Sequence, residues 1–96
     1  MDLERKRKTL NRWYILQALY AAGSTGVRQA LILECVTDED TQLTNRELEH
    51  SLGYLVQSGL VTRGQEELYF ITQQGYDVAE YNVEPPPGVK RPPKRY

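Results

Sequence analysis

Three polar side chains along one predicted helix are of the types that recognise nucleic-acid bases. Arg46, His50 and Gln57 fall on one face of a helix that begins near Thr44. A guanidinium can pair with guanine, and a carboxamide with adenine, in the major groove of DNA. Thr44 and Asn45, at the helix start, suit phosphate oxygens or base edges. This spacing predicts a face that contacts double-stranded DNA.

Positive charge gathers at the two ends of the chain, although the net charge of the 96 residues is only −1. Affinity for DNA rises with the number of phosphates that lysine and arginine neutralise, so these ends are the expected backbone contacts. Solvated terminal charge without a partner is the alternative. The expected contacts are Arg5, Lys6, Arg7 and Lys8 near the start, Lys90, Arg91, Lys94 and Arg95 near the end, and Arg63 and Gln65 between them.

The helix that would carry the base-reading face has strong local signals. Thr44 and Glu47 form a T-x-x-E capping box, in which each side chain satisfies a backbone N–H of the other residue. Gly59 provides a stop after the last helical turn. The expected buried side chains are Leu43 and Leu48, as a hydrophobic staple, followed by Leu52, Leu55 and Val56.

Two helices are predicted before this one. The first runs from about Leu3 or Lys8 to Ala22, with Ile15, Leu16 and Leu19 on its buried face. A second is expected over about 27–36, with a cap from Ser24 or Thr25 and with Val27 and Leu31 buried. A polar connection over 37–42 leads to the capped helix.

A hairpin and a last helix are predicted after Gly59. Residues 60–63 and 68–72 are rich in β-forming side chains and flank the polar turn 64–67. Thr72 can cap a helix over about 73–81. We therefore expect a mainly α fold with a small β-hairpin, the winged helix-turn-helix, over residues 1–82.

The last stretch of the chain, residues 83–96, holds all five prolines. Proline interrupts helices and favours extended backbone. A flexible, Pro-rich basic C-terminal tail is therefore expected.

The segment GLVTRGQEELYFITQQGYDVAE is similar to the strand–wing–strand–helix end of bacterial winged-helix regulators of the ArsR, MarR and PadR types. The resemblance implies a winged helix that binds DNA. Metal-sensing ArsR proteins use paired cysteines, whereas this chain has only Cys35. The matching positions are Gly59, Leu60, Val61, Ile71, Thr72, Gly75 and Ala79.

A narrower resemblance lies in DVAEYNVEPPPGVKRP, which looks like the close of small winged-helix proteins of Mu-like phages and prophages. It implies a phage- or prophage-encoded transcriptional regulator. The residues that carry the match are Asp77, Val78, Ala79, Pro87, Gly88, Val89, Lys90, Arg91 and Pro92.

Acidic residues beside the predicted reading face leave a second hypothesis open. Glu47 has a role in capping, but Glu49 would repel phosphates. Glu66 and Glu67 add charge of the same sign to the turn of the hairpin. The alternative is a protein-interaction module that has a winged-helix shape but no longer reads DNA, with the tail as a docking peptide.

Other classes lack their characteristic residues. With one cysteine and one histidine, the chain has no zinc-ligand pattern, and it shows neither a nucleophile–base pair nor a phosphate-binding loop. We expect no enzymatic activity, no cofactor, no membrane association and a cytoplasmic location. A homodimer through the first and last helices is expected from the aromatic surplus at Trp13, Tyr14, Tyr20, Tyr76 and Tyr81.

Overall fold

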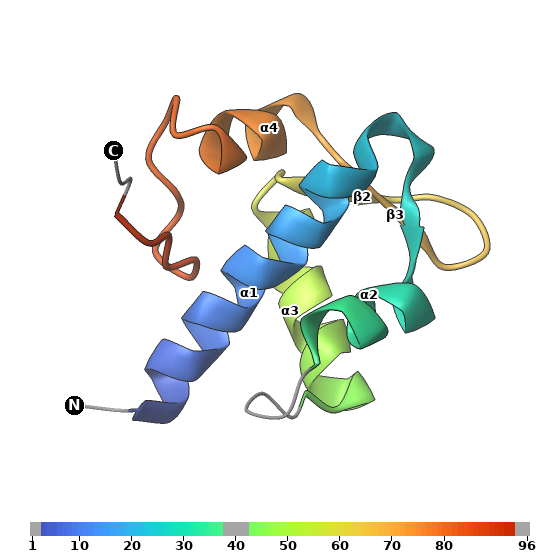
Figure 1. Ribbon diagram of the computed structural model, residues 1–96, viewed down its shortest axis with the longest axis horizontal. Helices are drawn as coiled ribbons and strands as arrows, with labels where there is room; N and C mark the ends of the chain where they lie inside the picture. Colours follow the sequence, from blue (N-terminus) through green and yellow to red (C-terminus); the bar gives the residue numbers. More distant parts are fainter. Residues whose placement is uncertain (1–2, 38–42, 94–96) are drawn as a thin grey trace.

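The chain folds into a mainly helical unit with a small antiparallel sheet, as a computed structural model shows (Figure 1). The structure describes residues 3–37 and 43–93, so most of the predicted connection at 37–42 lies outside the described residues. In chain order the elements are α1 (Leu3–Ala22), a 3-10 turn (Gly23–Thr25), β1 (Val27–Arg28), α2 (Gln29–Val36), α3 (Asn45–Gln57), β2 (Val61–Arg63), β3 (Leu68–Ile71) and α4 (Gln73–Ala79).

The start of α3 is as predicted. The Glu47 amide donates to Thr44 Oγ1 at 3.1 Å, and the Thr44 amide donates to Glu47 Oε1 at 3.0 Å, which completes the capping box. Leu43 and Leu48 are both buried at this end. The prediction was wrong for Val56, which is 37% exposed, because it lies one position beyond the stripe that faces α1.

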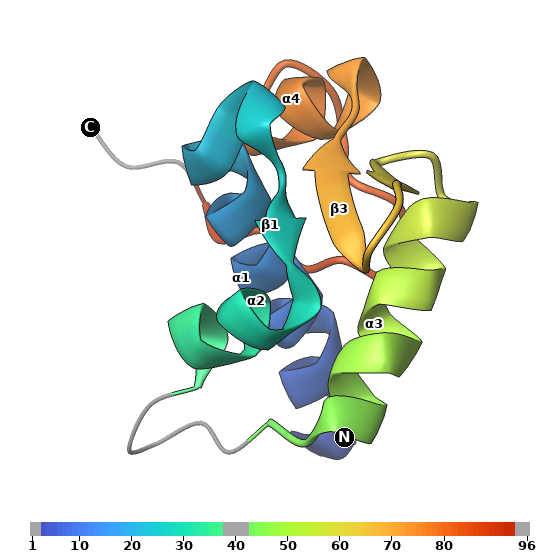
Figure 2. The same cartoon turned by 90° about the vertical axis from the view of Figure 1, so that its right-hand side faces the viewer.

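The predicted hairpin is confirmed and belongs to a sheet with one more strand. The strand order is β1-β3-β2, and both pairings are antiparallel. In Figure 2, β1 and β3 run side by side between α2 and α3. The strand β1 has two residues, Val27 and Arg28. This is too short for an alternation of buried and exposed side chains that would predict a strand from the sequence.

The extra strand corrects the prediction for the second helix. α2 begins at Gln29, and neither Ser24 nor Thr25 caps it, since Arg28 holds the N-cap position without a side-chain bond. Thr25 Oγ1 instead donates to the Ala22 carbonyl at 2.8 Å. The prediction was wrong for Leu31, which is 51% exposed, whereas Ile32 is fully buried in α2, a helix that packs against α1.

A single hydrophobic core joins α1, α3, the sheet and α4. The side chains at its centre come mostly from α1 and α3, which supply leucine and isoleucine at helical spacing. The fully buried residues are Ile15, Leu16, Leu19, Ile32, Leu48, Leu52, Leu55, Val61 and Val78.

The cap of α4 ties this helix to the end of α3. Thr72 Oγ1 accepts from the Gly75 amide at 3.1 Å and donates to the Gly59 carbonyl at 2.6 Å. A Cβ on Gly75 would collide with the Leu60 carbonyl oxygen, so only glycine fits here. α4 ends at Ala79, earlier than predicted, and Tyr81 takes a positive φ of 63°.

The segment after α4 packs against the domain, which corrects the expectation of a flexible tail for residues 86–91. This segment, drawn orange to red, turns back alongside α1 in Figure 1. Val89 is only 4% exposed and belongs to the core. The Lys90 amide donates to the Thr9 carbonyl of α1 at 3.0 Å, and the Gly88 amide donates to Tyr54 Oη of α3 at 2.8 Å. Residues 86–91 therefore form a segment that is docked on α1 and α3, called the docked segment below.

Candidate nucleic-acid interface

The predicted reading face of α3 is open to solvent. Arg46, His50 and Gln57 are exposed along one side of the helix, and Gly53 lies among them with no other atom within 4 Å of where a Cβ would stand. A groove of about 580 Å³ follows this face. Its lining residues are Arg12, Arg46, Glu49, His50, Gly53, Tyr54 and Gln57.

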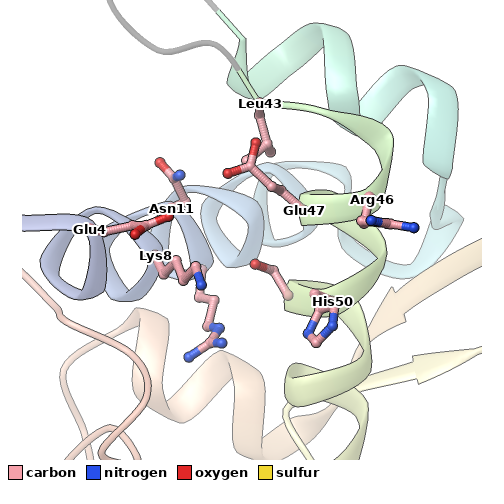
Figure 3. A pocket seen from close by; sticks show the side chains of 9 residues that line it. Glu4, Lys8, Asn11, Leu43, Arg46, Glu47 and His50 are labelled. Atoms are coloured by element: carbon pink, nitrogen blue, oxygen red, sulfur yellow. The ribbon is translucent and has the colours of Figure 1, made fainter.

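A second hollow, of about 280 Å³, lies between the starts of α1 and α3 (Figure 3). Glu4, Lys8 and Asn11 come from α1, and Figure 3 shows the Glu47 side chain reaching from α3 toward that side. Arg46 also lines this hollow, so the groove and the hollow adjoin.

The basic start of α1 lies beside the capped start of α3. Arg5, Lys6, Arg7 and Lys8 are all exposed. Arg7 Nη2 lies 3.9 Å from Glu47 Oε2, which makes an exposed ion pair of small energetic value. The structure therefore brings this predicted cluster close to the reading face.

The Glu47 carboxyl is held in its charged form. The hydrogen bond from the Thr44 backbone N–H lowers the pKa of Glu47, and the positive charges of Arg7 and Lys8 act in the same direction. Glu47 is thus occupied by capping and by a neighbouring cation, which reduces its repulsion of an approaching anion.

The hairpin places Arg63 and Gln65 on the other side of α3. Both are exposed, and the Arg63 guanidinium lies 5.9 Å from the centre of the Tyr69 ring. A hollow of about 530 Å³ separates the hairpin from α3. Arg28, on β1, is paired at 3.3 Å with Glu66 in the turn.

Glu49 is the strongest argument against a phosphate-binding surface. Glu49 is exposed. It lines the groove along α3 and also the hollow between α3 and the hairpin. Within residues 3–37 and 43–93 it accepts a hydrogen bond from Gln29 Nε2, which lies 3.4 Å from Glu49 Oε1. The carboxylate therefore adds negative charge to the middle of the reading face.

The residues predicted near the end of the chain divide into two groups. Lys90 is exposed, but Arg91 has a structural role. Arg91 Nη1 donates to the carbonyls of Val78 at 2.9 Å and Val83 at 2.7 Å, and its guanidinium stacks 4.2 Å from the Tyr81 ring. These contacts give Arg91 a role in holding residues 78–91 together, and its predicted contact with DNA stays a prediction. Lys94 and Arg95 lie outside the described residues.

Arg12 belongs to the basic cluster near the start of the chain, but it was not among the expected DNA contacts. It lines the groove along α3, the hollow between α1 and α3, and a third hollow of about 340 Å³ beside the docked segment. Arg12 lies four residues after Lys8, so both fall on one face of α1. This spacing could have indicated from the sequence that Arg12 joins the same surface.

The aromatic side chains mostly pack within the chain. Trp13 meets Tyr81 edge to face, with ring centres 5.9 Å apart, and Tyr20 meets Tyr76 in the same way at 5.7 Å. Tyr14 is 45% exposed. The aromatic surplus is therefore explained without a second copy of the chain.

The described residues were searched for metal sites and membrane-spanning helices, and the chain was compared with known proteins. Within 3–37 and 43–93, no three His, Cys, Asp or Glu side chains gather in a way that could hold a metal ion. None of the helices in these ranges is long and apolar enough to cross a bilayer. No protein-family model, curated protein or solved structure shows significant similarity to the chain.

Proposed function

We propose that this chain is a winged helix-turn-helix protein that binds double-stranded DNA and acts as a transcriptional regulator. α3 would be the reading helix, and the β2–β3 hairpin would be the wing. The observation that carries the proposal is the open stripe of Arg46, His50 and Gln57, flanked by the basic start of α1 on one side and by Arg63 on the other.

The dimensions of α3 suit the major groove. Its 13 residues span about 20 Å at 1.5 Å per residue, and the major groove is about 12 Å wide. Arg46 would pair with guanine and Gln57 with adenine. Gly53 leaves the middle of the helix without a side chain, which would allow close approach to the DNA.

The regulatory role rests on the resemblance of residues 77–92 to the close of winged-helix proteins of Mu-like phages and prophages. We also propose a homodimer, because one domain of this size reads about one half-site. Sedimentation equilibrium with and without DNA would test the dimer separately.

A mobility-shift titration against duplex DNA from the surrounding genome, at two salt concentrations, tests DNA binding. We expect a complex that weakens steeply with salt. Arg46→Gln should weaken it and relax the sequence preference, whereas Arg91→Gln should act mainly through the melting temperature. No shift by the wild-type protein at low salt would refute the proposal.

A protein-interaction module is the second candidate, and one observation favours it. Glu49 stands unpaired with any cation at the centre of the exposed face of α3, among the residues that the structure describes. A basic partner would complement this carboxylate. A pull-down that recovers a partner after nuclease treatment, and loses it with Glu49→Gln, would support this function in place of DNA binding.

A further inference from the structure

The Arg12 guanidinium is held in an unusual way at the junction of α1, α3 and the docked segment. It stacks 4.3 Å from the centre of the Tyr54 ring, and its Nη1 donates to the Gly88 carbonyl at 3.0 Å. Its Nε is buried without a hydrogen-bond acceptor. The side chain is thus fixed in position and partly withdrawn from water.

Arg12 has no counter-ion among the described residues. Ion pairs join Arg7 to Glu47 and Arg28 to Glu66, and no carboxylate of residues 3–37 and 43–93 pairs with Arg12. A partly desolvated cation without an anion is unfavourable, and it gains from binding one. The stacking on Tyr54 offsets this only in part.

The surroundings of Arg12 suit an anion. Arg12 is shared by three hollows, and the basic side chains Lys8, Arg46 and His50 are among their other lining residues. Glu49 also lines the groove along α3 and opposes an anion there. Two carboxylates, Glu4 and Glu47, face the hollow between α1 and α3. Glu47 is already bound to the Thr44 amide and to Arg7.

We propose that Arg12 anchors a phosphate group at the edge of the α3 groove, and that Tyr54 and Gly88 are its positioning residues. A guanidinium is a preferred phosphate ligand, and with Nε buried and Nη1 donating to Gly88, the donors left for a phosphate oxygen are the remaining N–H groups of Nη1 and Nη2. The source of the phosphate rests on the proposed function and is a backbone phosphate of duplex DNA. A free phosphate or phosphorylated small molecule has the same chemistry.

The salt dependence of DNA binding tests this anchor. Each phosphate contact contributes about 0.9 to the slope of log K against log salt. Arg12→Gln should therefore lower the slope by about 0.9 and weaken binding roughly eightfold at 0.1 M salt, with the sequence preference unchanged. Arg12→Lys should keep most of the slope. A melting curve for each variant shows that the fold is intact.

Arg28→Gln is the matched control, since it removes the same charge from a residue that is already paired with Glu66 and lines none of these hollows. Its slope should change far less. Equal slopes for wild type and Arg12→Gln, or equal losses for the Arg12 and Arg28 variants, would overturn the anchor while leaving DNA binding in place.

A second measurement separates the anchor from the proposed function. Inorganic phosphate is added to wild-type protein at constant ionic strength, and the NMR signal of the Arg12 side-chain Nε–H is followed. If the protein fails to bind DNA but phosphate shifts this signal, the anchor stands and its ligand is a small phosphorylated molecule. If neither DNA nor phosphate has an effect, both proposals fail.

Discussion

The Tyr54 hydroxyl accepts a hydrogen bond from the Gly88 amide at 2.8 Å, and this bond joins α3 to a segment 34 residues later in the chain. The same Tyr54 ring carries the Arg12 guanidinium on its face. One tyrosine therefore connects α3, the basic start of α1 and the docked segment. Substitutions in the segment 86–91 should consequently alter the positions of Tyr54 and Arg12, which line the groove along α3.

Gly88→Ala should loosen this connection, because a Cβ at Gly88 would overlap the Tyr54 ring. The loss of a hydrogen bond worth about 1 kcal/mol should speed hydrogen exchange at the Lys90 amide roughly fivefold. Gly53→Ala is the control, since a Cβ there meets nothing within 4 Å. Unchanged exchange in Gly88→Ala would show that the segment docks without this contact.

Val89→Ala should destabilise the whole domain, because Val89 is 4% exposed and lies in the core. Removing its buried methyl groups should lower the free energy of unfolding by about 1–2 kcal/mol. Val83, 47% exposed, offers the same substitution at the surface and should show little effect in urea unfolding. Similar curves for the two variants would mean that the docked segment contributes nothing to stability.

Glu49→Gln should strengthen DNA binding if α3 faces the phosphates. Removing one like-charge repulsion of about 1 kcal/mol should tighten binding roughly fivefold at low salt. Glu34→Gln, on the exposed side of α2, controls for the change in net charge and should leave the affinity nearly unchanged. Fluorescence anisotropy with a labelled duplex measures both. Weaker binding by the Glu49 variant would place DNA on another surface.

Thr44→Ala should weaken the start of α3, because it removes the oxygen that accepts from the Glu47 amide. The expected loss is about 1 kcal/mol in the free energy of unfolding. Ser24→Ala, at a position that caps no α-helix, should be close to neutral in the same denaturation experiment. A neutral Thr44→Ala would mean that solvent replaces the cap.

The stability of the domain should depend on Glu47 at acid pH. Its pKa is lowered in the folded state, mainly by the Thr44 backbone N–H, from an ordinary value of 4.5. The contribution of Glu47 is therefore present above pH 4.5 and is lost as the pH falls through the folded-state pKa. Thermal melting from pH 6 to pH 2.5 should show a shallower loss of stability for Glu47→Gln than for wild type.

Local signals explain why so much of the fold could be predicted. The capping box at Thr44 and the polar turn before Leu68 act over three or four residues, and both appear as expected. The two-residue strand β1 exists only because β3 lies beside it, so no local pattern marks it. The burial of Ile32 in place of Leu31 likewise depends on how α2 packs in the folded domain, which no local pattern fixes.

Part of the candidate site could be predicted from the sequence and part could not. The exposure of Arg46, His50 and Gln57 follows from helical spacing and the buried leucines, and it is confirmed. The roles of Arg12 and Arg91 depend on where residues 86–91 turn back, which composition alone cannot specify. Proline content predicts an extended backbone, but it does not predict whether that backbone packs against the rest of the domain.

Gly53 gives α3 a position where the fold itself imposes no demand on the side chain. A mid-helix glycine costs about 1 kcal/mol relative to alanine, and no described neighbour of Gly53 requires the missing Cβ. An alanine there would meet no other described side chain and should strengthen the helix of the isolated domain. Saturation mutagenesis of residue 53 should therefore report on the shape of whatever α3 meets more than on the packing of the domain.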